Sequence, residues 1–99
     1  MNGVLMLFGI YDEKAEAFMP PFVAPTKAHA IRTVADMTTD RESMVARHPG
    51  DFSLFCLGAM DQRTGEILPE KVNLGNCVEF RASVFGERLE EMSKEEGAA

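Results

Sequence analysis

The sequence predicts an α+β fold, an antiparallel sheet of four to five strands with two helices packed on one side. Residues 3–11 and 51–61 are apolar, carry β-branched and aromatic side chains, and are bounded by turn formers, which is typical of strands. Between them, residues 27–48 show the apolar spacing of helices. The 99-residue chain has 45% hydrophobic and 26% charged residues, so we expect a globular domain with its own core.

The first strand is expected at residues 3–11, followed by a polar turn at 12–16. Residues 17–25, AFMPPFVAP, can be extended but cannot form a central strand, because two consecutive prolines donate no hydrogen bonds to a ladder. We therefore expect an edge strand or a stiff arm there, with Phe18 and Phe22 packing inward.

This arm leads into a helix that is predicted at residues 27–38. Thr26 follows a proline and is expected to cap the helix by accepting a hydrogen bond from a first-turn amide. The apolar positions of this helix share one broad arc, so they form its predicted buried face: Ala28, Ile31, Val34, Ala35 and Met37.

A second, shorter helix is predicted at about residues 41–48, before the Pro-Gly pair that ends it. Asp40 is expected to be its N-terminal cap, since a short polar side chain can accept hydrogen bonds from the first amides. Met44 and Val45 are its expected inward residues.

The second half of the chain is predicted to return to the sheet. Residues 51–61 form a strong strand, and residues 61–65 a turn in which Gly65 supplies a positive φ. A weaker edge strand interrupted by Pro69, a turn and a last short strand are expected at 66–72, 73–76 and 77–81 respectively. We expect residues 1–82 to be a single α+β domain and residues 83–99 an acidic C-terminal tail, either an exposed helix or disordered.

Both long strands are apolar on both alternations, which is unusual for a sheet with helices on one side only. Seven Met and seven Phe add further apolar surface. Either the sheet curls tightly and buries both faces, or a second copy of the chain covers the free face. We favour a homodimer.

The net charge of −6 argues against simple binding to a polyanion. Residues 27–48 form the one long stretch that leans positive, with Lys27, Arg32, Arg41 and Arg47 as candidate phosphate contacts. Three aromatic side chains, if exposed, are candidates for stacking on unpaired bases: Tyr11, Phe18 and Phe22.

The sequence offers no catalytic or metal-binding pattern, and we expect neither an enzyme nor a cofactor. Two His and two Cys stand at spacings unlike those of zinc sites. Cys56 lies in an apolar strand, where a thiol is more often a packing residue than a nucleophile. The longest apolar run, residues 4–10, is too short to cross a bilayer and follows no basic segment, so we expect neither a membrane anchor nor a signal peptide.

Two stretches of the sequence carry a family resemblance. The pattern IYD-KAE-F-PPF-AP within residues 7–40, and the pattern HP-DF-LF-LG--D--TG within residues 48–67, resemble the small nonstructural protein of gokushoviruses. These are microviruses, tailless phages with circular single-stranded DNA genomes. The resemblance covers about residues 5–70 and leaves residues 83–99 unmatched.

This resemblance implies a protein of the bacterial host's cytoplasm that acts in phage DNA replication or genome packaging. Two mechanisms follow from it. In the first, a homodimer binds single-stranded DNA through the basic stretch and the aromatic side chains named above. In the second, the acidic protein contacts viral replication or packaging proteins, namely the replication initiator or the procapsid, without touching DNA.

Overall fold

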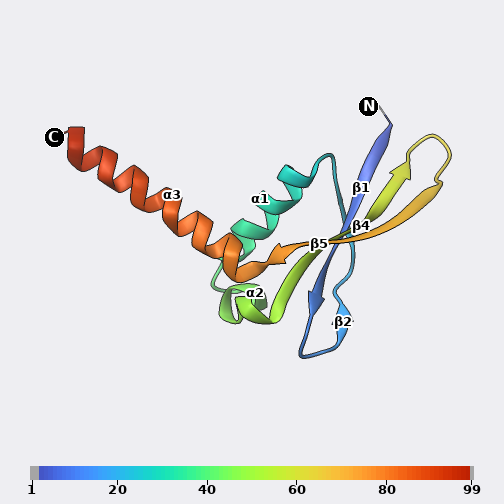
Figure 1. Cartoon of the computed structure of the whole chain (residues 1–99), viewed down its shortest axis with the longest axis horizontal. Helices are drawn as coiled ribbons and strands as arrows, with labels where there is room; N and C mark the ends of the chain where they lie inside the picture. Colours follow the sequence, from blue (N-terminus) through green and yellow to red (C-terminus); the bar gives the residue numbers. More distant parts are fainter. Residues whose placement is uncertain (1–2, 99) are drawn as a thin grey trace.

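The computed structural model describes residues 3–98, and the side chains of residues 3–92. Its strands form one antiparallel sheet in the order β2-β1-β4-β5, and β3 pairs with β1 as well (Figure 1). The strands are β1 (Val4–Asp12), β2 (Ala17–Phe18), β3 (Phe22–Ala24), β4 (Phe52–Asp61) and β5 (Ile67–Asn76). The predicted α+β class and antiparallel sheet are confirmed.

The proline-rich arm lies along the free edge of β1, as predicted. Phe18 pairs with Tyr11 and Phe22 pairs with Phe8, so the two short strands β2 and β3 both pair with β1, one after the other along its edge. The two consecutive prolines separate them, because a residue without an N–H cannot continue the ladder.

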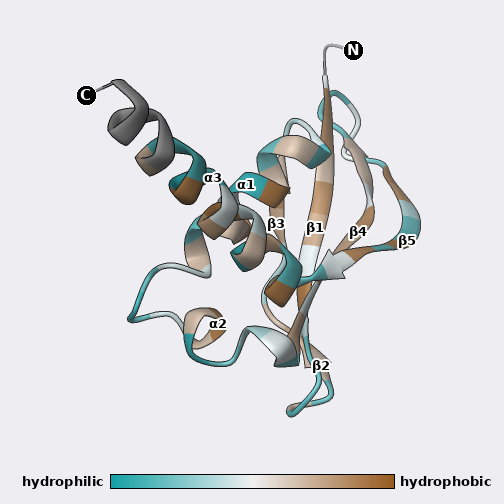
Figure 2. Ribbon diagram, turned by 60° about the vertical axis from the view of Figure 1, so that its left-hand side comes forward, coloured by the Kyte–Doolittle hydropathy of each residue, from teal (hydrophilic) through white to brown (hydrophobic). Residues whose placement is uncertain are grey.

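Two longer helices, α1 (Lys27–Met37) and α3 (Cys77–Ala98), lie on one side of the sheet, and the short α2 (Met44–Arg47) and a 3₁₀ turn (Pro49–Asp51) precede β4 (Figure 2). Thr26 caps α1 as predicted, since its Oγ1 accepts a hydrogen bond of 3.1 Å from the His29 amide. Among the described residues, no helix is long and apolar enough to cross a membrane.

The predicted helix at 41–48 is too long. The helix begins only at Met44, with Ser43 as its cap, whereas Asp40 accepts a hydrogen bond from the Glu42 amide within the preceding turn. Val45 is fully buried as expected, but Met44 is 55% exposed, because a single helical turn buries only one of two consecutive side chains.

The core lies between the sheet and the helices. Phe8 and Leu54 from the sheet and Val34 and Val45 from the helices are completely buried. The remaining buried apolar residues surround them: Ile10, Ala24, Ala30, Phe52, Cys56, Cys77 and Phe80. Of the predicted arc on α1, Val34 is buried but Ala28 is exposed, and Ala30 takes the central place.

The turn predicted at 73–76 and the strand predicted at 77–81 are wrong. Strand β5 continues to Asn76, and α3 begins at Cys77. Asn76 Oδ1 accepts a hydrogen bond from the Val78 amide, while its Nδ2 donates to the Gly50 carbonyl at 3.0 Å. A capping side chain anchored by a distant loop therefore starts a helix where the local pattern indicated a strand.

Helix α3 continues without a break through the predicted domain boundary at residue 82 and extends away from the sheet (Figure 1). Cys77 and Phe80 are buried, whereas Leu89 and Met92 are 66% and 58% exposed. Residues 83–98 are thus helical, as the last part of α3. Whether this segment is separable from the domain stays a prediction.

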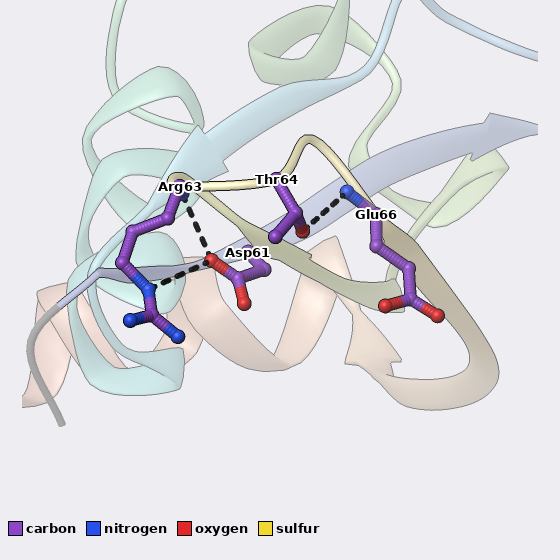
Figure 3. A network of polar contacts seen from close by, with 4 residues as sticks. All are labelled: Asp61, Arg63, Thr64 and Glu66. Carbon is purple, nitrogen blue, oxygen red and sulfur yellow. Dashed lines mark hydrogen bonds and ion pairs between the residues drawn. The ribbon is translucent and has the colours of Figure 1, made fainter.

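The turn between β4 and β5 closes the hairpin as predicted, with Gly65 at φ 77°. Asp61 Oδ1 accepts a hydrogen bond of 2.8 Å from the Arg63 amide and pairs with its guanidinium at 3.8 Å (Figure 3). Thr64 Oγ1 accepts a hydrogen bond from the Glu66 amide. These polar contacts are local to the turn and serve the hairpin.

Candidate nucleic-acid interface

The face of the sheet opposite the helices carries a cluster of three aromatic rings. Tyr11 from β1, Phe18 from β2 and Phe55 from β4 lie edge to face, with ring centroids 5.0 Å apart for Tyr11–Phe18 and 5.3 Å apart for Phe18–Phe55. The third pair, Tyr11–Phe55, is separated by 6.4 Å. Because side chains alternate along a strand, these rings point away from the core that their neighbours build. We call this group the aromatic face.

A lysine lies on the aromatic face. Lys71 Nζ of β5 is 5.5 Å from the centroid of the Phe18 ring and 5.4 Å from that of Phe55. Such cation–π geometry holds the ammonium group beside the rings while it remains available to an anion. The rings themselves are only partly covered, with Phe18 36% exposed.

The aromatic face depends on a glycine beneath it. A Cβ atom at Gly9 would lie 2.8 Å from Leu57 Cδ1 and 3.1 Å from Phe18 Cδ1. Both side chains can therefore lie close over β1 only because this position has no side chain.

The structure divides the predicted aromatic residues. Phe18 was expected to pack inward, and this expectation is wrong, because its pairing with Tyr11 places it on the outer face. Phe22 does pack inward, and its ring stacks on that of Phe8 at 5.7 Å. Tyr11 and Phe18 therefore share a surface, and Phe22 lies on the other side of the sheet.

The predicted basic residues lie on the helical side of the molecule. Arg41 and Arg47 line one pocket, together with Arg81 and Arg88 of α3. Arg32 lines a different groove between α1 and α3, where Asp36 and Glu87 are also present and offset its charge.

Lys27 is exposed at the first position of α1. The four predicted cations are thus not one surface, and they are not on the face that carries the rings of Tyr11 and Phe18. Arg41 and Arg47 alone share a pocket. Segment 38–47 and strand β2 nevertheless lie at the same end of the sheet (Figures 1 and 2).

Four residues of these two surfaces were missed from the sequence. Phe55 and Lys71 could have been found from the strand alternation of 51–61 together with its pairing to the next strand. Arg81 and Arg88 were missed because residues 77–81 were interpreted as a strand, whereas a helix from Cys77 places them seven positions apart on one side.

The two thiols are buried and unpaired with each other. Burial raises the pKa of Cys77 from 9.0 to about 11, so this thiol stays protonated at neutral pH. No group of three or more His, Cys, Asp or Glu side chains that could hold a metal ion occurs within the described part of the chain.

These features define a small α+β domain with an uncovered aromatic sheet face on one side and an arginine-lined pocket on the other. The chain belongs to the family described as Phage ORF5 protein, whose model matches residues 5–80. No curated protein and no solved structure matches the chain. The family match includes the sheet, α1 and α2 but ends before Arg81, and it supports the phage origin that the resemblance implied.

Proposed function

We propose that this phage protein binds single-stranded DNA and acts without catalysis in replication or genome packaging of a gokushovirus-type phage, in the cytoplasm of the infected bacterium. One observation carries the proposal, the aromatic face of Tyr11, Phe18 and Phe55 with Lys71 beside it. Partly exposed rings next to a cation are what single-strand binders use for base stacking and phosphate contact.

The aromatic face favours single strands over duplex for a physical reason. In a duplex each base already stacks on its neighbours, so a flat protein ring has no free base surface to contact. The charge of the chain points the same way, because a net −6 leaves too little positive potential to hold a duplex by its phosphates alone.

A homodimer is part of the proposal. Leu5 and Met60 pair across β1 and β4, and with Leu7 they continue the uncovered face of the sheet away from the aromatic rings. Partly buried aliphatic side chains of this kind suit a second copy, while the aromatic end stays open to DNA. Light scattering should then give about 22 kDa, twice the chain mass of 10.9 kDa, and a mass near that of one chain would contradict the dimer.

Fluorescence anisotropy with a labelled oligothymidylate, measured over a salt series, tests DNA binding. We expect weak binding with a logarithmic salt slope of about −2 to −3, the value for three or four phosphate contacts on a single strand. Phe55→Ala should weaken binding by roughly 1–3 kcal/mol, the usual cost of losing one stacked ring.

Leu68→Ala is the matched control, since it also shortens an apolar side chain of the sheet, one that is 64% exposed and outside the aromatic cluster. Its affinity should equal that of the wild type. Equal loss in both variants, or retention of full affinity by Phe55→Ala, would exclude the aromatic face as the binding site.

The alternative function is contact with the replication initiator or with procapsid proteins, and the same DNA-binding experiment decides between the two. Helix α3 favours it, because Phe85, Leu89 and Met92 are exposed on an acidic helix that extends from the sheet. Failure of the wild type to bind any oligonucleotide at low salt would make this protein-binding function the leading one.

A further inference from the structure

A pocket of about 370 Å³ opens between residues 38–47 and the first half of α3. Four of its eight lining residues are arginines, two from the segment around α2 and two from α3: Arg41, Arg47, Arg81 and Arg88. We call it the arginine pocket. Thr38, Thr39, Ala46 and Phe85 complete its walls.

The charge of this pocket contrasts with that of the chain. The protein carries 16 Asp and Glu against 10 Lys and Arg, yet four of those ten line the pocket and no carboxylate does. Within residues 3–92, the one ion pair joins Arg63 to Asp61 in a distant turn. Four guanidinium groups around one space repel one another, and an anion bound between them relieves that repulsion.

Arg81 gives the pocket a fixed element. Its guanidinium carbon lies 5.3 Å from the centroid of the Phe85 ring, and its Nε is buried with no hydrogen-bond partner among the described residues. Buried polar atoms are normally hydrogen-bonded, so this donor, which has no partner among the described residues, adds unmet hydrogen-bonding capacity to a residue that lines the basic pocket.

The hydroxyl groups of the two threonines already donate to backbone carbonyls and leave no spare donor for a ligand. Thr38 Oγ1 donates to the Ala35 carbonyl at 2.6 Å, and Thr39 Oγ1 donates to the Asp36 carbonyl at 3.0 Å. The hydrogen-bond donors offered to a ligand are therefore the guanidinium groups.

We propose that the arginine pocket is a binding site for a phosphate group. Guanidinium groups match the tetrahedral oxygens of phosphate in pairs, and their planar forks lose little freedom on binding. The volume is at the small end of the range for ligand sites and suits a phosphate with the sugar that carries it. The phosphate comes either from the backbone of a DNA strand or from a free nucleotide. The inference is independent of the aromatic face, which lies on the other side of the sheet.

Titration calorimetry with inorganic pyrophosphate at constant ionic strength tests the site. The wild type should bind, and the double variant Arg41→Gln, Arg47→Gln should bind at least about tenfold more weakly, since charge-assisted hydrogen bonds are the stronger class of hydrogen bond. The control double variant Lys14→Gln, Arg63→Gln has the same net charge as the Arg41→Gln, Arg47→Gln variant, but it changes exposed residues outside the arginine pocket. It should bind like the wild type.

The four altered side chains are exposed, so both double variants should fold, and their urea midpoints check this. Arg88→Gln, a single change from α3, should also weaken pyrophosphate binding. Phe55→Ala on the aromatic face should not, which separates this site from the proposed DNA surface. Equal affinity in the wild type and in both Arg variants, or equal loss in the control, would overturn the proposal.

Two further titrations distinguish the sources of the phosphate. The first probe is an abasic strand of ten deoxyribose phosphates, compared with dTMP. If the abasic strand binds more tightly than dTMP, and this difference in affinity disappears in the double variant Arg41→Gln, Arg47→Gln, the pocket binds the DNA backbone. Tighter binding of dTMP assigns it to a free nucleotide. Thymidine, which has no phosphate, should not bind, and binding of thymidine as strong as that of dTMP would contradict a phosphate site.

Discussion

The two faces of the sheet use the same three long strands for different purposes. On the covered face, Phe8 and Leu54 are completely buried against α1 and α2. On the uncovered face, Tyr11 and Phe55 alternate with them along β1 and β4 but keep part of their surface open, beside the cation of Lys71. Apolar content alone does not separate the faces. The difference lies in exposure and charge, because the rings of the uncovered face stay partly open beside a lysine, whereas the aromatic and aliphatic side chains of the covered face are close-packed and buried.

The largest effect is expected on the covered face. Leu54→Ala removes a side chain with no exposed surface from the centre of the core, and should lower the free energy of unfolding by about 3–5 kcal/mol. Urea unfolding measures it. A loss below about 1 kcal/mol would mean that this face is not the core, and the comparison between the faces would fail.

A smaller loss is expected at high pH, also on the covered side. The pKa of Cys77 is raised by burial from 9.0 to about 11. Below pH 9 the thiol is neutral in both states and its contribution to stability is complete, whereas between pH 9 and 11 only the unfolded chain releases the proton, so stability falls. Urea midpoints over this range should fall more steeply for the wild type than for Cys77→Ala. Equal slopes would contradict the burial of this thiol.

On the uncovered face, Gly9→Ala should change binding more than folding. The added methyl group would displace the ends of the Leu57 and Phe18 side chains, which can move, so we expect a stability change within about 1 kcal/mol. The displaced Phe18 ring should reduce the affinity for oligothymidylate several-fold. An unchanged affinity would show that the arrangement of the rings does not matter to binding.

The smallest effect is expected far from both faces. A chain that ends after Arg88 loses Leu89 and Met92, which are mostly exposed, and should melt within about 4 °C of the full chain. Ending it after Ala82 should cost more, because Val84 is half-buried in the groove beside α1. Equal melting temperatures for the two truncations would mean that α3 does not stabilise the domain beyond residue 82.

The sequence predicts those parts of the fold that local chemistry determines. Thr26 caps α1, Gly65 turns the hairpin, and the alternation of residues 51–61 assigns Leu54 and Phe55 to opposite faces, because each needs only its near neighbours. Local pattern fails at Asn76, whose amide is held by Gly50, 26 residues earlier in the chain. No residue close to Asn76 in the sequence indicates that contact.

The candidate sites were predicted in part for the same reason. Tyr11 and Phe18 were named as stacking residues, but only the pairing register between β1 and β2 brings their rings together and away from the core. Arg41 and Arg47 were named as phosphate contacts. Their partners Arg81 and Arg88 depend on where α3 begins, which is set by the distant hydrogen bonds of Asn76.

The emission of Tyr11 tests the DNA-binding aromatic face most directly. Tyr11 is the single tyrosine of the chain, which has no tryptophan, and the Tyr11 ring is part of the aromatic cluster. Intrinsic fluorescence therefore reports on this face alone. Titration with unlabelled oligothymidylate should quench this emission along the same binding curve that anisotropy gives, because a base stacks on or beside the ring. Binding by anisotropy with unchanged Tyr11 emission would place the DNA elsewhere and contradict the account.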